Sequence, residues 1–202
     1  MLAIIDYGVG NLFSLRSSLA AIGVDAVVSG DAEVLRKADR LILPGVGAFG
    51  DAADKLRETG MDVVVKEEAA KGKPIMGICL GMQLLFEKGY EYGVHQGLGL
   101  LKGTVGPISE IIPEGLNIPH MGWNALKFVR ECPLTKYISE GAYVYFVHSY
   151  AAGGCEESLA CTCEYGADLT AMVAKGNVFG CQFHPEKSGE TGLNILRAFC
   201  EL

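Results

Sequence analysis

Positive charge is scarce and scattered in this sequence. Lysine and arginine number 17 against 24 aspartate and glutamate residues, the net charge is −7, and basic residues form no cluster. Nucleic acids and anionic membranes attract proteins mainly through clustered positive charge. The sequence therefore predicts neither a nucleic acid nor a membrane surface as a partner.

Long apolar runs are also missing. No uninterrupted apolar segment approaches the ~18 residues of a membrane-spanning helix, and Met1–Asp6 lacks the basic region and apolar core of a signal peptide. The chain has seven cysteines. An odd number of cysteines without an export signal is typical of the reducing cytoplasm, where thiols stay free. We therefore expect a cytoplasmic protein.

Patterns that would bind a cofactor or a metal ion are incomplete. Gly8-Val9-Gly10 begins like a dinucleotide fingerprint, but Phe13 stands where the third glycine is required. Cys161 and Cys163 are the only closely spaced pair of cysteines, and no second pair of cysteine or histidine residues complements them. Their alternation is typical of one face of a strand. The sequence predicts neither a metal nor a cofactor.

Hydrophobic residues and glycine are what the sequence has in abundance. Hydrophobic residues make up 50% of the chain, and 27 of its 202 residues are glycine. This length and composition fit a globular protein with one full core, and we find no linker, repeat or low-complexity segment. We expect a single domain over residues 1–202 with many backbone turns that need glycine.

The most informative segment lies between residues 73 and 88. Pro74–Ile78 is an apolar run of strand length, and a helical pattern follows from Leu80. Between them, the glycines of a G-x-C-x-G turn flank Cys79. A strand, a tight turn and a helix are the context of a nucleophile elbow, in which the pivot side chain stands clear of the sheet. We therefore predict that Cys79 is a nucleophile and that the Leu80 N–H helps to bind an oxyanion. The alternative is a small buried cysteine in a loop.

Hydrophobic periodicity predicts the fold class. The first ~90 residues alternate strands and helices, which is typical of a mainly parallel sheet with helices on both faces, an α/β three-layer sandwich. Strands are expected at 3–6, 25–28, 41–43 and 74–78, and helices at 12–22, in a short segment before residue 41, at 51–70 with a break at Gly60, and at 80–88. Short apolar runs then predict antiparallel extension strands at 98–101, 105–109, 123–128, 142–147, 159–163, 170–174 and 178–181. Of these, 170–181 is the clearest hairpin, and a helix over 190–202 ends the chain.

Ligands of parallel α/β sheets bind at the carboxyl ends of the strands. By this topology, the glycine-rich loop Pro44–Gly50 and Cys79 lie at the same edge. The glycines of the Pro44–Gly50 loop let backbone N–H groups approach a substrate, so this loop is predicted to form the second half of the oxyanion hole. The alternative is an ordinary connecting loop.

A cysteine nucleophile needs a base, and the chain has four histidines. His184 follows the expected strand at 178–183 and precedes Pro185 and Glu186. Since residues i and i+2 of an extended segment point to the same side, the Glu186 carboxylate can orient the imidazole. His95 is expected to be exposed in a polar loop, and His120 and His148 remain open. We predict the triad Cys79–His184–Glu186.

Taken together, these residues resemble the class I glutamine amidotransferase family. The glutaminase domains of that family carry a G-x-C-x-G-x-Q elbow, here Gly77–Gln83, and a His-Pro-Glu segment, here residues 184–186. The resemblance is nearest to glutaminase subunits that serve a barrel synthase of imidazole glycerol phosphate, and it covers essentially the whole chain. The further segments that carry it are Asp6–Asn11, Pro44–Phe49, Pro119–Asn124 and His148–Tyr150.

The resemblance implies an activity and a partner. Cys79 would attack the side-chain amide of glutamine, form a glutamyl thioester and release ammonia. A (β/α)₈-barrel synthase subunit in a heterodimer would use that ammonia in histidine biosynthesis. The implied oxyanion and substrate residues are Val46, Gly47, Leu80, Gln83, Ser149 and Tyr150. The implied partner-interface residues are Asn11, Pro119, His120, Met121, Trp123 and Asn124.

Other functions remain open at this point. A related amidotransferase could feed another synthase, such as those for pyridoxal phosphate or anthranilate, although the Pro119–Asn124 segment argues against this. A free-standing cysteine hydrolase or peptidase of similar fold would turn over esters or peptides without a partner. A non-catalytic binding subunit is the last alternative, and the intact triad argues against it.

Overall fold

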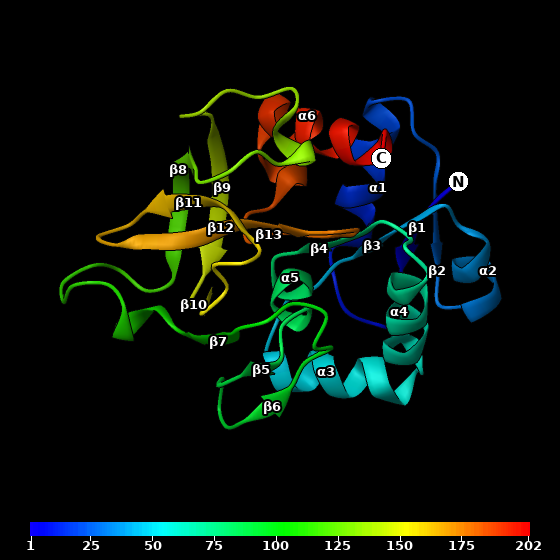
Figure 1. Ribbon diagram of the computed structural model, residues 1–202, viewed down its shortest axis with the longest axis horizontal. Helices are drawn as coiled ribbons and strands as arrows, with labels where there is room; N and C mark the ends of the chain where they lie inside the picture. Colours follow the sequence, from blue (N-terminus) through cyan, green and yellow to red (C-terminus); the bar gives the residue numbers. More distant parts are fainter.

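A nine-stranded mixed sheet runs through the centre of the molecule (Figure 1). The computed structural model describes residues 1–202. The strands follow the order β2-β1-β3-β4-β13-β12-β11-β8-β9, and neighbours are parallel as far as β13 and antiparallel beyond it. The parallel strands are β1 (Leu2–Ile5), β2 (Ala26–Ser29), β3 (Arg40–Leu43), β4 (Ile75–Ile78) and β13 (Val178–Cys181). The antiparallel strands are β8 (His120–Phe128), β9 (Tyr143–His148), β11 (Leu159–Glu164) and β12 (Asp168–Lys175).

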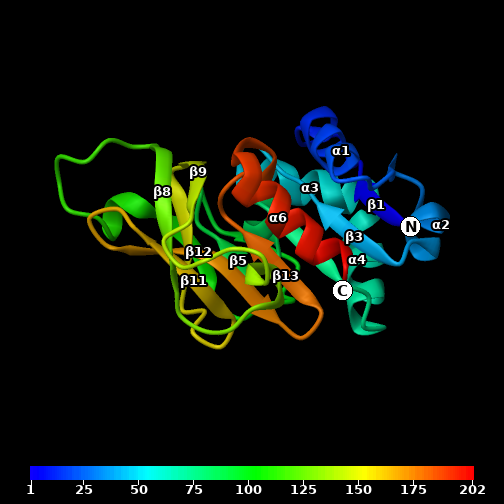
Figure 2. The same cartoon turned by 90° about the horizontal axis from the view of Figure 1, so that it is seen from above.

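Helices cover both faces of the parallel half (Figures 1 and 2). One face carries α1 (Leu12–Ala21) and α6 (Gly189–Cys200), and the other carries α2 (Ala32–Lys37), α3 (Phe49–Glu58), α4 (Met61–Ala70) and α5 (Leu80–Leu84). Three short 3₁₀ turns lie at Ile108–Glu110, Pro133–Thr135 and Pro185–Lys187. None of the helices has the length and apolarity needed to cross a membrane. The expected three-layer α/β fold is confirmed.

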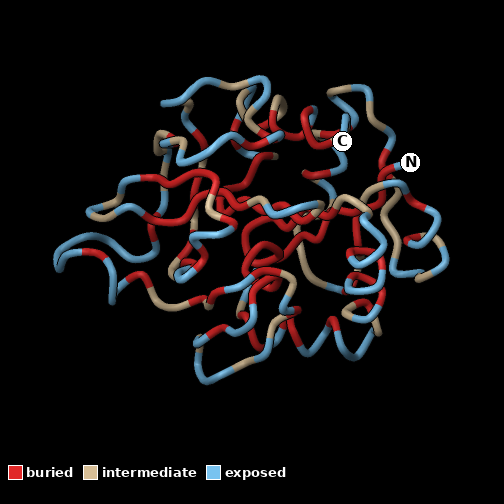
Figure 3. The backbone as a smooth tube through the Cα atoms, viewed as in Figure 1, coloured by how far each residue is buried: buried red, intermediate tan, exposed pale blue.

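Strand β1 shows why both faces must be covered. Leu2 and Ile4 belong to the core beneath α1 and α6, whereas Ala3 and Ile5 belong to the core on the opposite face. All four residues of the strand are buried, as an apolar run in a parallel sheet requires. The buried part of the chain accordingly follows the sheet and the inner helix faces, and the exposed part follows the loops (Figure 3).

A second, four-stranded sheet was not predicted. It has the order β10-β7-β5-β6, with β5 at Lys88–Gly89, β6 at His95–Gln96, β7 at Thr104–Pro107 and β10 at Tyr150–Gly153. The expectation that the run at 105–109 extends the main sheet was therefore wrong, since β7 pairs with β5 and β10. The chain crosses from the main sheet into this one at Ser149, between β9 and β10.

The expected helix over 80–88 begins as predicted but ends earlier, and the expected strand over 98–101 was wrong, both for one reason. Helix α5 ends at Leu84, and the segment after residue 96 folds back onto its end. The N–H of Leu98 donates to the Leu84 carbonyl, and the N–H groups of Leu100 and Leu101 donate to the Leu85 carbonyl. These bonds satisfy carbonyls that a helix terminus leaves free, so the segment caps α5 instead of forming a strand.

Two predicted turns are confirmed. The strands β12 and β13 pair as a hairpin around Gly176, which has a φ of +59°. Helices α3 and α4 are separated at Gly60, where φ is +71°. Both positions use the left-handed region that glycine adopts at no steric cost.

Candidate active site

Cys79 occupies a strained pivot between β4 and α5. Its φ of 54° and ψ of −114° lie outside the regions that residues with a Cβ atom normally adopt. The flanking glycines allow the turn to pack tightly: a Cβ at Gly81 would lie 1.9 Å from the Leu43 carbonyl oxygen, and one at Gly77 would lie 2.6 Å from the Gly81 carbonyl oxygen. The predicted elbow geometry is therefore present, and it is pressed against the end of β3.

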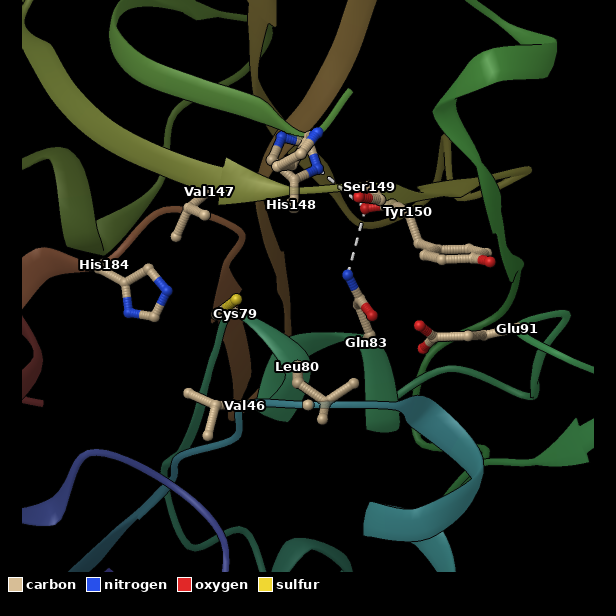
Figure 4. Close-up of a pocket in the computed structure, with 12 residues that line it drawn as sticks. Val46, Cys79, Leu80, Gln83, Glu91, Val147, His148, Ser149, Tyr150 and His184 are labelled. Carbon is tan, nitrogen blue, oxygen red and sulfur yellow. Dashed lines mark hydrogen bonds between the residues drawn. The ribbon is translucent and has the colours of Figure 1, made fainter. Parts of the chain in front are cut away.

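A cavity of about 340 Å³ opens at this edge of the sheet. The side chain of Cys79, with 8% of the residue exposed, lies on its wall. Figure 4 shows the side chains that surround it, from the β3–α3 loop, the elbow, the β9–β10 crossing and the segment after β13. The lining residues are Val46, Gly47, Cys79, Leu80, Gln83, Glu91, Pro119, Val147, His148, Ser149, Tyr150 and His184. The cavity therefore collects every residue predicted for the nucleophile, the oxyanion hole and the substrate, together with His184.

His184 and Glu186 form a buried pair. Glu186 Oε1 lies 2.8 Å from His184 Nδ1, and their side chains are 5% and 3% exposed. Burial alone lowers the pKa of His184, but hydrogen bonds and charge interactions with the Cys79 thiolate and the Glu186 carboxylate outweigh it and raise the pKa to about 9. The imidazole therefore carries a proton at neutral pH when it faces a thiolate.

Replacing Glu186 with glutamine should move the alkaline limb of the pH–rate profile to lower pH. The carboxylate raises the pKa of His184, so its loss lowers that pKa and the proton needed by a leaving group is lost at a lower pH. The measurement is the pH dependence of glutamate release. Glu190→Gln, a matched change at an exposed position of α6, should leave the profile in place, and an unmoved alkaline limb in Glu186→Gln would contradict this role of Glu186.

The β3–α3 loop lies directly against the elbow, as predicted. A Cβ at Gly45 would lie 2.6 Å from the Gly81 nitrogen, so only glycine allows this approach. Val46 and Gly47 then border the cavity, and Gly47 has a φ of +91°, with no atom within 4 Å of where a Cβ would stand. This loop therefore places Val46 and Gly47 in the wall of the cavity that Cys79 also lines.

The side chain of Gln83, which was expected to bind the substrate, is largely engaged within the protein. Its Nε2 donates to the Tyr150 carbonyl oxygen (3.2 Å) and to Gln182 Oε1 (3.0 Å), so both hydrogens of the amide are used within the protein. His148 Nδ1 donates to the same Tyr150 carbonyl (2.8 Å). Only the Oε1 of Gln83 remains available to a ligand, so Gln83 serves mainly to fix the wall formed by Ser149 and Tyr150.

Glu91 is a lining residue that the sequence analysis missed. It accepts a hydrogen bond from the Phe49 N–H at the start of α3 (2.7 Å, to Oε2), and its side chain lies beside that of Tyr150 in the cavity lining (Figure 4). Its segment has no recognisable motif, and 42 residues separate it from Phe49. His95, expected to be exposed, is instead partly buried against Gly50, where a Cβ would lie 2.5 Å from its ring.

The residues expected at a partner interface divide into exposed and buried members. Met121 and Trp123 are 60% and 53% exposed on β8, and Trp123 packs edge-on against Tyr145. His120, in contrast, is fully buried. Its ring nitrogens lie 3.0 Å from His148 Nε2 and 2.8 Å from Asn124 Oδ1. The side chain of His120 is therefore unavailable for direct contact with a partner, because alternation along β8 turns it inward.

The remaining expected interface residues also have structural partners. The Asn11 side chain accepts a hydrogen bond from the Ser14 N–H and caps α1 (3.3 Å). Asn124 Nδ2 donates to the Glu164 carbonyl oxygen (3.0 Å). Pro119 is exposed and borders the cavity itself. Of these three residues, only Pro119 lines the cavity.

Comparison with known proteins agrees with this arrangement. The family model described as "Glutamine amidotransferase class-I" matches residues 3–201. The chain belongs to this family. Two relatives named "Imidazole glycerol phosphate synthase subunit HisH" are each 51% identical to this amidotransferase. The one from Caldanaerobacter subterraneus subsp. tengcongensis aligns over 100% of this chain and 98% of its own. The one from Lactococcus lactis subsp. lactis aligns over 99% and 98%.

Solved structures share the fold of this amidotransferase at low sequence identity. A structure described as "Crystal structure of glutamine amidotransferase" superposes with a TM-score of 0.77 at 20% identity and covers 99% of this chain and 97% of its own. The "Structure of PurLQS from Thermotoga maritima" gives a TM-score of 0.77 at 23% identity, with the same coverage. At these identities the likeness supports the fold and no more.

Proposed function

We propose that this amidotransferase is the glutaminase subunit of an imidazole glycerol phosphate synthase and that it acts in histidine biosynthesis. The observation that carries the proposal is that Cys79 and His184 line one cavity and that Glu186 is hydrogen-bonded to His184. Two relatives that bear the name of that synthase subunit are 51% identical to this chain and align over 98% of their own length. We take residues 1–202 as one domain and the cytoplasm as its compartment.

In the proposed reaction, glutamine lies in the cavity with its side-chain amide at Cys79. The thiolate attacks the amide carbon, and the S–C bond forms as the carbonyl becomes an oxyanion. The C–N bond then breaks, and the His184 imidazolium gives its proton to the departing nitrogen, which leaves as ammonia. Water, deprotonated by His184, attacks the thioester, and glutamate leaves as the Cys79 sulfur is regained.

Backbone N–H groups from the two sides of the cavity stabilise the oxyanion in this proposal. Leu80 is the first residue of α5, so its N–H lacks an acceptor within the helix. The Val46 N–H from the opposite loop is the second donor. A rotation of the Gly45–Val46 peptide, which carries this N–H, aims it at the substrate, and glycine at position 45 makes that rotation inexpensive. Binding of the partner subunit drives this step.

The partner is a (β/α)₈-barrel synthase subunit that receives the ammonia. Exposed apolar side chains at, or close in sequence to, the residues that line the cavity support this proposal. Val46 lines the cavity, Ile118 precedes the lining residue Pro119, and Met121 and Trp123 follow it on β8. All four are large, apolar and exposed, as is typical of a protein-binding surface. A partner seated there covers the cavity and keeps ammonia from the solvent. It also contacts the loop that carries the second oxyanion donor.

The deciding experiment measures glutamate release with and without the barrel subunit and its ligand. We expect slow release from the amidotransferase alone and a gain of at least about 100-fold in the complex, because the oxyanion hole is completed only there. Product formation from added ammonium salts is the control for the barrel's own activity. A chain that hydrolyses glutamine at the same rate without any partner, or that joins a different synthase, would contradict the proposal.

A further inference from the structure

Gln182 is a buried polar residue that the proposed mechanism does not use. It lies between β13 and His184, and none of its surface is exposed. Its Oε1 accepts a hydrogen bond from Gln83 Nε2 (3.0 Å), and its Nε2 lies 3.7 Å from Cys79 Sγ. A buried amide is stable only when its hydrogen bonds are made, so the sulfur is one of its partners.

The orientation of this amide follows from its neighbours. The Tyr150 carbonyl oxygen can only accept, so the Gln83 atom 3.2 Å away must be the donor Nε2. The same Nε2 faces Gln182, so the facing atom of Gln182 must be the acceptor Oε1. The donor Nε2 of Gln182 is thereby turned toward Cys79. Reversing the Gln182 amide would set two NH₂ groups against each other and an oxygen against the sulfur.

The chain of hydrogen bonds that leads from the Tyr150 carbonyl oxygen through Gln83 and Gln182 to Cys79 begins at a well-fixed backbone atom. The Tyr150 carbonyl oxygen accepts from His148 Nδ1 as well as from Gln83. Burial is the main cause that lowers the pKa of His148, to about 4, so His148 is neutral near pH 7. The His148 Nδ1–H donates to the Tyr150 carbonyl oxygen. One amide hydrogen of Gln83 donates to the same oxygen, and the other donates to Gln182.

We propose that Gln182 is a positioning residue, whose side-chain N–H donates to the Cys79 sulfur and stabilises it as a thiolate. An N–H donor binds a charged acceptor more strongly than a neutral one, so the contact favours the thiolate over the thiol. The proposal rests on the proposed role of Cys79 as nucleophile. Gln182 is then a hydrogen-bond donor to the sulfur on the side toward Gln83, and His184, two residues later in the chain, is a second donor.

The test follows the rate of Cys79 alkylation by iodoacetamide against pH, with no glutamine and no partner present. In Gln182→Met the side chain keeps its length but loses the donor, and the midpoint of the curve should rise by roughly half a pH unit to one unit. In Gln182→Glu one oxygen still accepts from Gln83, but the other places negative charge beside the sulfur. Its midpoint should rise by more than one unit. An unmoved midpoint in folded Gln182→Met overturns the proposal.

Three controls separate this role from simple support of the fold. Gln96→Glu makes the same change at an exposed position of β6 and should leave the midpoint in place. Thermal unfolding of each variant records loss of stability, which by itself does not move an alkylation midpoint. If both Gln182 variants fail to fold, the side-chain amide ¹⁵N signal of Gln182 in the unchanged protein decides. It should shift with the Cys79 titration, and a constant signal overturns the proposal.

Failure of this proposal and failure of the proposed function give different results. Alkylation reports on the sulfur and its donors and needs no turnover. A shifted midpoint in a protein that releases no glutamate would support the role of Gln182 and contradict the glutaminase. Normal glutamate release with unshifted midpoints would support the glutaminase and contradict the role of Gln182.

Discussion

Replacing Cys79 with alanine is expected to abolish glutamine-dependent formation of product in the complex with the barrel subunit. The loss should be about 1,000-fold or more, since the only sulfur that lines the cavity is removed and loss of a nucleophile commonly costs this much. Synthesis from free ammonia should continue at the unchanged rate, because ammonia needs no thioester. The two rates are measured on the same preparation, with glutamine in one assay and ammonium chloride in the other.

Cys200→Ser is the matched control for this experiment. Cys200 lies at the end of α6 and is partly buried away from the cavity, so both rates should stay within about twofold of the unchanged protein. Equal loss of both rates in Cys79→Ala would show that the change harms assembly or the barrel, and the role assigned to Cys79 would then be wrong. A variant that keeps its glutamine-dependent rate would exclude the thioester mechanism.

The parts of the site that lie within short segments could be predicted from the sequence. The glycines at 77 and 81 are needed by the turn itself, and Glu186 reaches His184 because only two positions separate them. Local chemistry of this kind leaves a readable pattern. The alternating elements of the first half likewise predicted a sheet whose carboxyl edge joins the loop after β3 to Cys79.

The parts that depend on distant segments could not be predicted. Gln182 and Gln83 are 99 positions apart, and Glu91 reaches Phe49 across 42. Nothing local marks either contact. The second sheet escaped prediction because β7 and β10 are short strands whose pairing depends on the crossing at Ser149. The family resemblance of the Pro119–Asn124 segment implied that His120 lies at an interface, yet the twofold alternation of β8 turns its side chain inward.

A methyl group added at Gly81 is expected to disrupt both stability and catalysis. Its Cβ would lie 1.9 Å from the Leu43 carbonyl oxygen and 3.1 Å from the Pro44 carbonyl carbon, and both are backbone atoms that cannot rotate away. Either the elbow or the end of β3 must move. We expect Gly81→Ala to lower the free energy of unfolding by about 3 kcal/mol. Displacement of the loop from Cys79 should lower kcat by at least about 100-fold.

Gly106→Ala separates this steric effect from the general cost of replacing glycine. Gly106 lies in β7, and a Cβ there would meet no atom within 4 Å. Neither position requires a positive φ, so the two variants differ mainly in the space around the new methyl group. Denaturant unfolding and glutamate release should be close to unchanged in Gly106→Ala. If Gly81→Ala unfolded and turned over like Gly106→Ala, close contact between the elbow and β3 would not be what holds Cys79 against the oxyanion loop.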